Sequence, residues 1–257
     1  MNVERVLPIA GKVAFALFVA AATIGLVAAL GTRTGIWDYH IGLLKIFPWC
    51  VFVGLAAFAL SLVWGIGALF FADGGRARWG ASALAGSILL LYTPLTTVLN
   101  ASGLPHIHDI STDPEYPPQF EDLLPLRQGA ETPASYDGPV RVLDNGVMHT
   151  TAYLQKIYFA DLHPRGILLP PTKVFWRTFR AAKEMGWNIV SFNADSGRIE
   201  ATDTSFFFGI TDDIVIRVKP SGQGTRVDVR SKSRINQPDL GRNAFAMREF
   251  FKKLAAM

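Results

Sequence analysis

Residues 227–243 read Val-Asp-Val-Arg-Ser-Lys-Ser-Arg-Ile-Asn-Gln-Pro-Asp-Leu-Gly-Arg-Asn. Val227 and Val229 alternate with Asp228 and Arg230, which is the two-residue period of a half-buried strand. A polar corner then leads into a helix that continues to the end of the chain. A strand that enters a helix through such a corner gathers hydrogen-bonding groups at one edge of a sheet.

The residues before this corner indicate an antiparallel sheet. Alternating apolar residues predict strands over 187–193, 198–204, 214–218 and 226–231. The turn at 194–197 and the Gly-rich turn at 220–224 make neighbouring strands antiparallel. Apolar stripes at helical spacing predict helices over 151–160, 171–186 and 239–255. The fold class is therefore α+β, with about four strands packed against two or three helices.

The helix expected over 171–186 has two unlike faces. Its apolar stripe contains Val174, Ala181 and Met185, and its opposite face is basic. The basic residues are Lys173, Arg177, Arg180 and Lys183. A solvated face is the simpler interpretation. The alternatives are contact with anionic headgroups, with the acidic segment described below, or with an acidic partner.

The first part of the chain is apolar enough to cross a membrane. Only nine of the first hundred residues are charged, although 18% of all 257 residues are. Uncharged runs cover residues 13–32, 46–72 and 79–105, and each is long enough to span a bilayer. Residues 1–104 are therefore expected to form three transmembrane helices. The absence of charged residues deep in these runs argues against a transporter core or an ion pathway.

Basic residues near the run ends predict the orientation. Arg33 and Lys45 lie on one side of the expected bilayer. The other side holds more basic residues, which are Arg5, Lys12, Arg76 and Arg78. Because the more basic side faces the cytoplasm, the N-terminus should be cytoplasmic and the residues after about 100 should lie outside.

Residues 105–145 differ from both neighbouring regions. From His106 to Asn145 there are eight carboxylates, two arginines and six prolines. This composition predicts an extended tether that either lies over the following domain or leads away from the bilayer. The globular domain is then expected to cover 146–257.

The start of this acidic segment also allows a metal site to be considered. Imidazole and carboxylate groups that can bind a metal occur at His106, His108, Asp109, Asp113 and Glu115. A solvated turn is the favoured interpretation, and no metal or other cofactor is expected.

The polar corner is the candidate functional site. It joins residues at the expected start of one strand, the end of the next and the start of the last helix, which antiparallel pairing brings together. They are Asp212, Asp213, Arg230, Ser231, Ser233, Arg234, Asp239 and Asn243. A structural latch, with Asp212 or Asp213 paired to an arginine, is favoured over a pocket for a small anionic or polar ligand. Catalysis is least favoured, because the chain lacks nucleophile, zinc-protease and phosphate-loop motifs.

Three short patterns around this corner resemble a bacterial family of unknown function, DUF1499. They are Gly-Ile-Thr-Asp-Asp-Ile-Val-Ile-Arg at 209–217, Asp-Val-Arg-Ser-Lys-Ser-Arg at 228–234 and Asp-Leu-Gly-Arg-Asn at 239–243. Supporting patterns at 107–113, 161–164 and 186–187 extend the resemblance from about residue 105 to the end. The resemblance implies a bacterial envelope domain, preceded in some relatives by several membrane spans, and it implies no activity.

The favoured function is a membrane-anchored, extracytoplasmic binding or assembly module with no chemistry of its own. The expected location is the bacterial inner membrane, with a periplasmic domain. Expected partners are the lipid bilayer, another membrane protein or a small polar ligand, whereas the net charge of +4 is too small to indicate nucleic acid.

Two alternatives remain open. One is an envelope hydrolase that uses the carboxylates of Asp212, Asp213 and Asp239. The other is an accessory subunit of a larger membrane complex. Its spans would dock through small residues repeating every four positions, at Ala21, Gly25 and Ala29.

Overall fold

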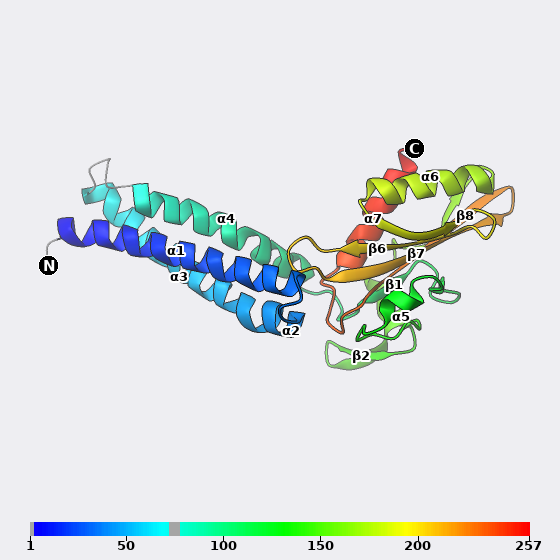
Figure 1. The fold of residues 1–257 in the computed structure, drawn as a ribbon, viewed down its shortest axis with the longest axis horizontal. Coiled ribbons are helices and arrows are strands. Elements are labelled where there is room, and N and C mark those ends of the chain that lie inside the picture. The colour runs from blue at the N-terminus through cyan, green and yellow to red at the C-terminus, as the bar shows by residue number, and fades with distance from the viewer. Residues whose placement is uncertain (1–2, 72–77) are drawn as a thin grey trace. The chain divides into compact units, whose positions relative to one another are not determined.

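A computed structural model describes residues 3–71 and 78–257 of the chain. The contacts divide it into two compact units (Figure 1), which are described separately. The membrane unit is Met1–Ser102 with Phe206–Gly209, and the globular unit is Gly103–Ser205 with Ile210–Met257. Arg76, which contributes to the predicted orientation, lies outside the described residues.

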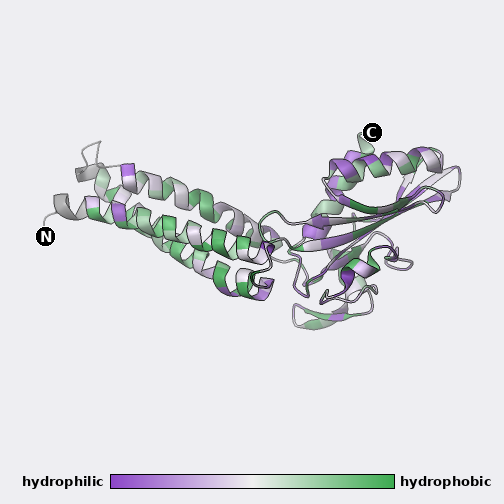
Figure 2. Cartoon of the chain, in the orientation of Figure 1, coloured by the Kyte–Doolittle hydropathy of each residue, from purple (hydrophilic) through white to green (hydrophobic). Residues whose placement is uncertain are grey.

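The membrane unit contains three long apolar helices, as the sequence predicts. They are α1 (Val3–Arg33), α3 (Phe47–Phe71) and α4 (Arg78–Ala101), and the short α2 (Tyr39–Ile41) and a π-helical turn (Gly42–Ile46) lead into α3. Stretches of 26, 30 and 24 residues, at Pro8–Arg33, Tyr39–Ala68 and Arg78–Ala101, are long and apolar enough to cross a membrane. Figure 2 shows the apolar residues that dominate these helices.

Small residues let the helices of this unit approach closely. Ala21 and Ala29 are buried. A Cβ atom added to Gly25 would lie 2.9 Å from Sγ of Cys50 on α3, which is closer than packed atoms tolerate. The repeat of small residues is therefore used in packing within this helix group, as is common in lipid. It gives no separate reason to expect another membrane protein.

The globular unit is built on a six-stranded antiparallel sheet. Its strands are β1 (Asp109–Ser111), β4 (Arg165–Ile167), β5 (Asn188–Asn193), β6 (Arg198–Thr204), β7 (Thr211–Ser221) and β8 (Gly224–Ser233). The order is β1-β8-β7-β6-β5, and β4 also pairs with β8. The four predicted strands form the meander β5–β8, and the short β1 and β4 are additions that the sequence analysis missed.

Two helices cover one face of this sheet (Figure 1). The three predicted helices are present as α5 (Thr151–Tyr158), α6 (Pro171–Glu184) and α7 (Arg242–Ala255). Residues of α6 and α7 share one hydrophobic core with Ile214, Ile216 and Val229 of the sheet. Val227 and Val229 are completely buried, as the alternation predicts. The α+β fold class is thus confirmed.

The acidic segment lies over the domain, which is one of the two courses that the sequence left open. Its first residues form β1, and Phe120 and Leu123 pack on Val215, whose side chain points away from the helices. A 3₁₀ turn (Leu124–Arg127) and the hairpin of β2 (Arg141–Asp144) and β3 (Val147–Thr150) follow. The compact unit therefore begins at Gly103 rather than at residue 146.

Candidate functional site

The structure divides the predicted corner between the two faces of the sheet. Asp212 pairs with Ser233 across the β7–β8 ladder, and the next residue, Asp213, pairs with Lys232. Because neighbouring strand residues point to opposite faces, these two aspartates lie on opposite sides of the sheet. The eight predicted residues therefore form two clusters and not one constellation.

The first cluster lies on the side of the helices. Ser231 donates its hydroxyl to Oδ1 of Asn243 at 2.6 Å, and Ser233 donates to Oδ1 of Asp212 at 2.5 Å. Asn243 in turn donates its amide to Ser233 Oγ at 3.3 Å and to the carbonyl oxygen of His108 at 3.2 Å. These buried hydrogen bonds tie the first turn of α7 to the end of β8 and to β1.

Asp239 completes this cluster at the start of α7. Its Oδ1 accepts the backbone N–H of Gly241 at 2.9 Å, and its Oδ2 accepts that of Asn243 at 3.1 Å. A carboxylate in this position satisfies N–H groups that the helix itself leaves unpaired and lies at the positive end of the helix dipole. Burial raises the pKa of Asp239, and these hydrogen bonds partly oppose that change.

Asp212 is a second buried carboxyl of this cluster. Its side chain is buried, and burial raises its pKa from 3.8 to about 6, although Arg242 and the Ser233 hydroxyl favour the charged form. Nη1 of Arg242 lies 2.6 Å from its Oδ2, and the same guanidinium bonds Asp203 at 2.8 Å. Asp212 is thus a shielded carboxyl held between the sheet and α7.

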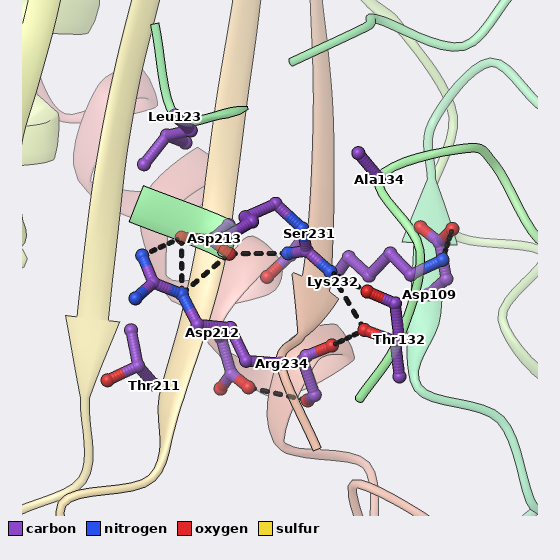
Figure 3. Close-up of polar contacts among 12 residues, drawn as sticks. Asp109, Leu123, Thr132, Ala134, Thr211, Asp212, Asp213, Ser231, Lys232 and Arg234 are labelled. Atoms are coloured by element: carbon purple, nitrogen blue, oxygen red, sulfur yellow. Dashed lines mark hydrogen bonds and ion pairs between the residues drawn. The ribbon is translucent and has the colours of Figure 1, made fainter. Parts of the chain in front are cut away.

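The second cluster lies on the opposite face and is ionic (Figure 3). Arg234 donates Nε and Nη2 to the two carboxylate oxygens of Asp213 at 2.9 and 2.7 Å, and Arg127 also donates to Asp213. Arg230 donates Nε and Nη2 to the two oxygens of Asp109, both at 2.9 Å. Both arginines thus make the bidentate contacts expected of the corner, but Arg230 uses a partner from β1.

Lys232 and Asp137 extend this layer and were not among the predicted residues. The Lys232 ammonium is completely buried, 2.7 Å from Oδ1 of Asp137 and 3.4 Å from Oδ2 of Asp109. Nε2 of His108 lies 3.2 Å from the other oxygen of Asp137. Burial acts to raise the pKa of Asp137, but hydrogen bonds to His108 and Lys232 outweigh it and lower the pKa.

More carboxylates of the acidic segment pair with basic residues of the same sheet face. Asp113 lies 3.2 Å from Nη2 of Arg217 and 2.6 Å from Nη2 of Arg226, and Glu121 pairs with Arg198. We call residues 109–137 the acidic cover, because they lay carboxylates over a row of arginines and a lysine. The negative charge of this segment neutralises the positive charges of the basic side chains that the strands direct to this face.

A comparison with protein-family models finds a match over the region that contains both clusters. A family model described as "Protein of unknown function (DUF1499)" matches residues 109–254. The chain belongs to the DUF1499 family. The match starts at the aspartate that pairs with Arg230 and ends in α7, so the acidic cover is part of the DUF1499 domain. A comparison with curated proteins gives no match.

The metal alternative finds no support in the described part of this DUF1499 protein. Asp109 and Asp113 are both engaged by arginines. Within residues 3–71 and 78–257, no group of three or more His, Cys, Asp or Glu side chains is arranged to hold a metal ion.

The DUF1499 domain also exposes an aromatic and basic surface, formed by α6 and the edge strand β5. Trp176 and Phe192 are about half exposed, and the ring of Phe179 lies 4.7 Å from that of Phe192. The Lys183 ammonium lies 4.8 Å from the Phe179 ring. A hollow of about 430 Å³ opens here, lined by Phe179, Lys183 and Phe192 and by Trp187 and its neighbours in β5. The sequence analysis identified the basic side of α6 but not the aromatic residues beside it.

Proposed function

We propose that this DUF1499 protein is a membrane-anchored, extracytoplasmic module that binds or assembles with a partner and performs no chemistry itself. The burial of the polar corner carries this proposal. Asp212 is 2% exposed and Asp213 is 0% exposed, and each is held by at least one arginine. A hydrolase needs its carboxylates to reach substrate and water, so these enclosed residues suit a structural position better than catalysis.

The aromatic and basic surface of α6 and β5 is the best candidate for recognition. Aromatic residues and arginine are enriched in protein interfaces, because they bury much apolar area while retaining polar contacts. The acidic cover lies on the opposite face of the sheet, where its carboxylates pair with basic strand residues, so it does not neutralise α6. The charge of α6 therefore favours a protein partner with an acidic segment.

A photo-reactive amino acid at Trp176 is expected to form a specific cross-link in intact cells. The matched control is the same amino acid at Tyr116, which is 75% exposed and lies on the acidic cover. The double variant Arg177→Glu/Arg180→Glu should reduce the Trp176 cross-link at least tenfold and leave the protein level unchanged. Equal cross-linking at Trp176 and Tyr116, or insensitivity to the charge reversal, would contradict the proposal.

The proposed location is the bacterial inner membrane, with a cytoplasmic N-terminus and a periplasmic domain. An odd number of membrane spans would leave the two ends of the chain on opposite sides of the bilayer, and Lys12 and Arg78 favour a cytoplasmic N-terminal side. In a Cys50→Ala background, Ser196→Cys should react with an impermeant maleimide on intact spheroplasts. Asn2→Cys should react only after lysis. The reverse pattern would show that the domain is cytoplasmic.

A further inference from the structure

The loop between β6 and β7 presents unusually exposed phenylalanines. Residues 205–210 read Ser-Phe-Phe-Phe-Gly-Ile. Phe206 is 79% exposed and Phe207 is 58% exposed. Leaving two large aromatic side chains in water is unfavourable by roughly 25 cal/mol for each Å² of apolar surface. Adjacent exposed rings of this kind commonly mark a contact surface.

The backbone of this loop is closed by its own hydrogen bonds. The Ser205 N–H donates to the carbonyl oxygen of Ile210 at 2.8 Å, and the Ile210 N–H donates to Ser205 Oγ at 2.9 Å. Gly209 has a φ of +67°, a conformation that few other residues adopt readily. The loop therefore holds its phenylalanines at the tip of a hairpin in a defined conformation.

Contacts within the membrane unit place this loop beside the ends of two spans. Nη1 of Arg33, the last residue of α1, donates to the carbonyl oxygen of Phe206 at 2.6 Å, and its guanidinium lies 5.7 Å from the Phe206 ring. The ring of Phe208 meets that of Phe47, the first residue of α3, edge-on at 5.3 Å. Arg33 ends the first membrane-crossing stretch (Pro8–Arg33), and Phe47 lies eight residues into the second (Tyr39–Ala68). If these helices cross a bilayer, the connection between the two stretches lies at its surface.

We propose that the loop 205–210 is a lipid-contacting element whose Phe206 and Phe207 rings enter the boundary between headgroups and acyl chains. Aromatic side chains are favoured at this depth, and an arginine at a span end can keep its charge among the headgroups. The bilayer is the fitting occupant because Phe206–Gly209 of the loop belong to the same compact unit as the three apolar helices. This inference depends neither on the protein partner proposed above nor on which side of the membrane the domain occupies.

Spin-label accessibility in the full chain tests this element. The protein, with Cys50→Ala and Phe207→Cys, is labelled and reconstituted into vesicles of phosphatidylcholine and phosphatidylglycerol. Collision rates with oxygen, which partitions into lipid, and with a water-soluble nickel chelate are then measured. We expect the label at 207 to meet oxygen several times more often than nickel.

The matched controls are Ser196→Cys, in the exposed turn before β6, and Ser221→Cys, at the exposed last residue of β7. Since β7 has 11 residues, these positions lie about 30 Å from the loop. Labels there should meet nickel more often than oxygen. A label at 207 that behaves like these controls, or that is shielded from both reagents, would overturn the proposal. Circular dichroism of each variant shows whether the fold is retained, and a label at Phe206→Cys provides a second reading if the 207 variant misfolds.

Discussion

Replacing Arg230 by methionine is expected to destabilise the globular unit by about 3–5 kcal/mol. The Arg230 side chain is completely buried, and its guanidinium makes two 2.9 Å bonds to Asp109. It also lies 4.6 Å from the ring of Phe120 and donates to the carbonyl oxygen of Ala134 at 3.0 Å. Methionine retains the apolar stem but removes the charge, which leaves the buried Asp109 carboxyl group without its bidentate partner.

Urea unfolding of the full chain in detergent, followed by circular dichroism, measures this loss. Adding Asp109→Leu to Arg230→Met should restore part of the lost stability. Removing both charged groups is less destabilising than leaving one of them buried without its partner. The matched control is Arg248→Met, which breaks the exposed pair of Arg248 and Asp161 and should cost about 1 kcal/mol or less. A similar loss for Arg230→Met and Arg248→Met would show that the ionic layer does not stabilise the domain.

The sequence predicted the parts of the fold that depend on local patterns. The meander of four strands and the three helices follow from periodicity and turn residues within short windows. β1 and β4 have three residues each, and they pair with β8 across long sequence separations, Asp109 with Lys232 and Arg165 with Val227. A strand of three residues has too few alternations to be recognised, so only the folded chain reveals it.

The candidate site was predicted as a set of residues but not as an arrangement. Asp212 and Asp213 are adjacent in sequence, but successive residues of a strand point to opposite faces of the sheet. The two carboxyl groups therefore cannot belong to one site. Lys232 lies two residues from both Arg230 and Arg234, so the same alternation could have placed it on their face. The acidic cover could have been matched to these basic residues by charge, since eight carboxylates and only two arginines lie between His106 and Asn145.

Replacing Asp212 by asparagine is expected to change the pH dependence of stability. The folded-state pKa of about 6 lies above the usual value of 3.8, because burial penalises the charged carboxylate. The unfolded chain therefore releases this proton first as the pH rises. The stabilisation from a protonated Asp212 is complete below about pH 4 and is lost as the pH rises through about 6. A difference of about two pKa units corresponds to about 3 kcal/mol.

An asparagine side chain has no proton to release, so the Asp212→Asn protein should gain about 3 kcal/mol relative to the parent between pH 4 and pH 7.5. Urea unfolding of both proteins at a series of pH values gives this difference directly. Asp195→Asn, in the exposed β5–β6 turn, is the control for loss of a carboxylate outside this cluster. If the Asp212→Asn protein instead lost relative stability as the pH rose, the pairing with Arg242 at 2.6 Å would outweigh burial. Asp212 would then be a stabilising carboxylate, and its folded-state pKa would lie below the usual value.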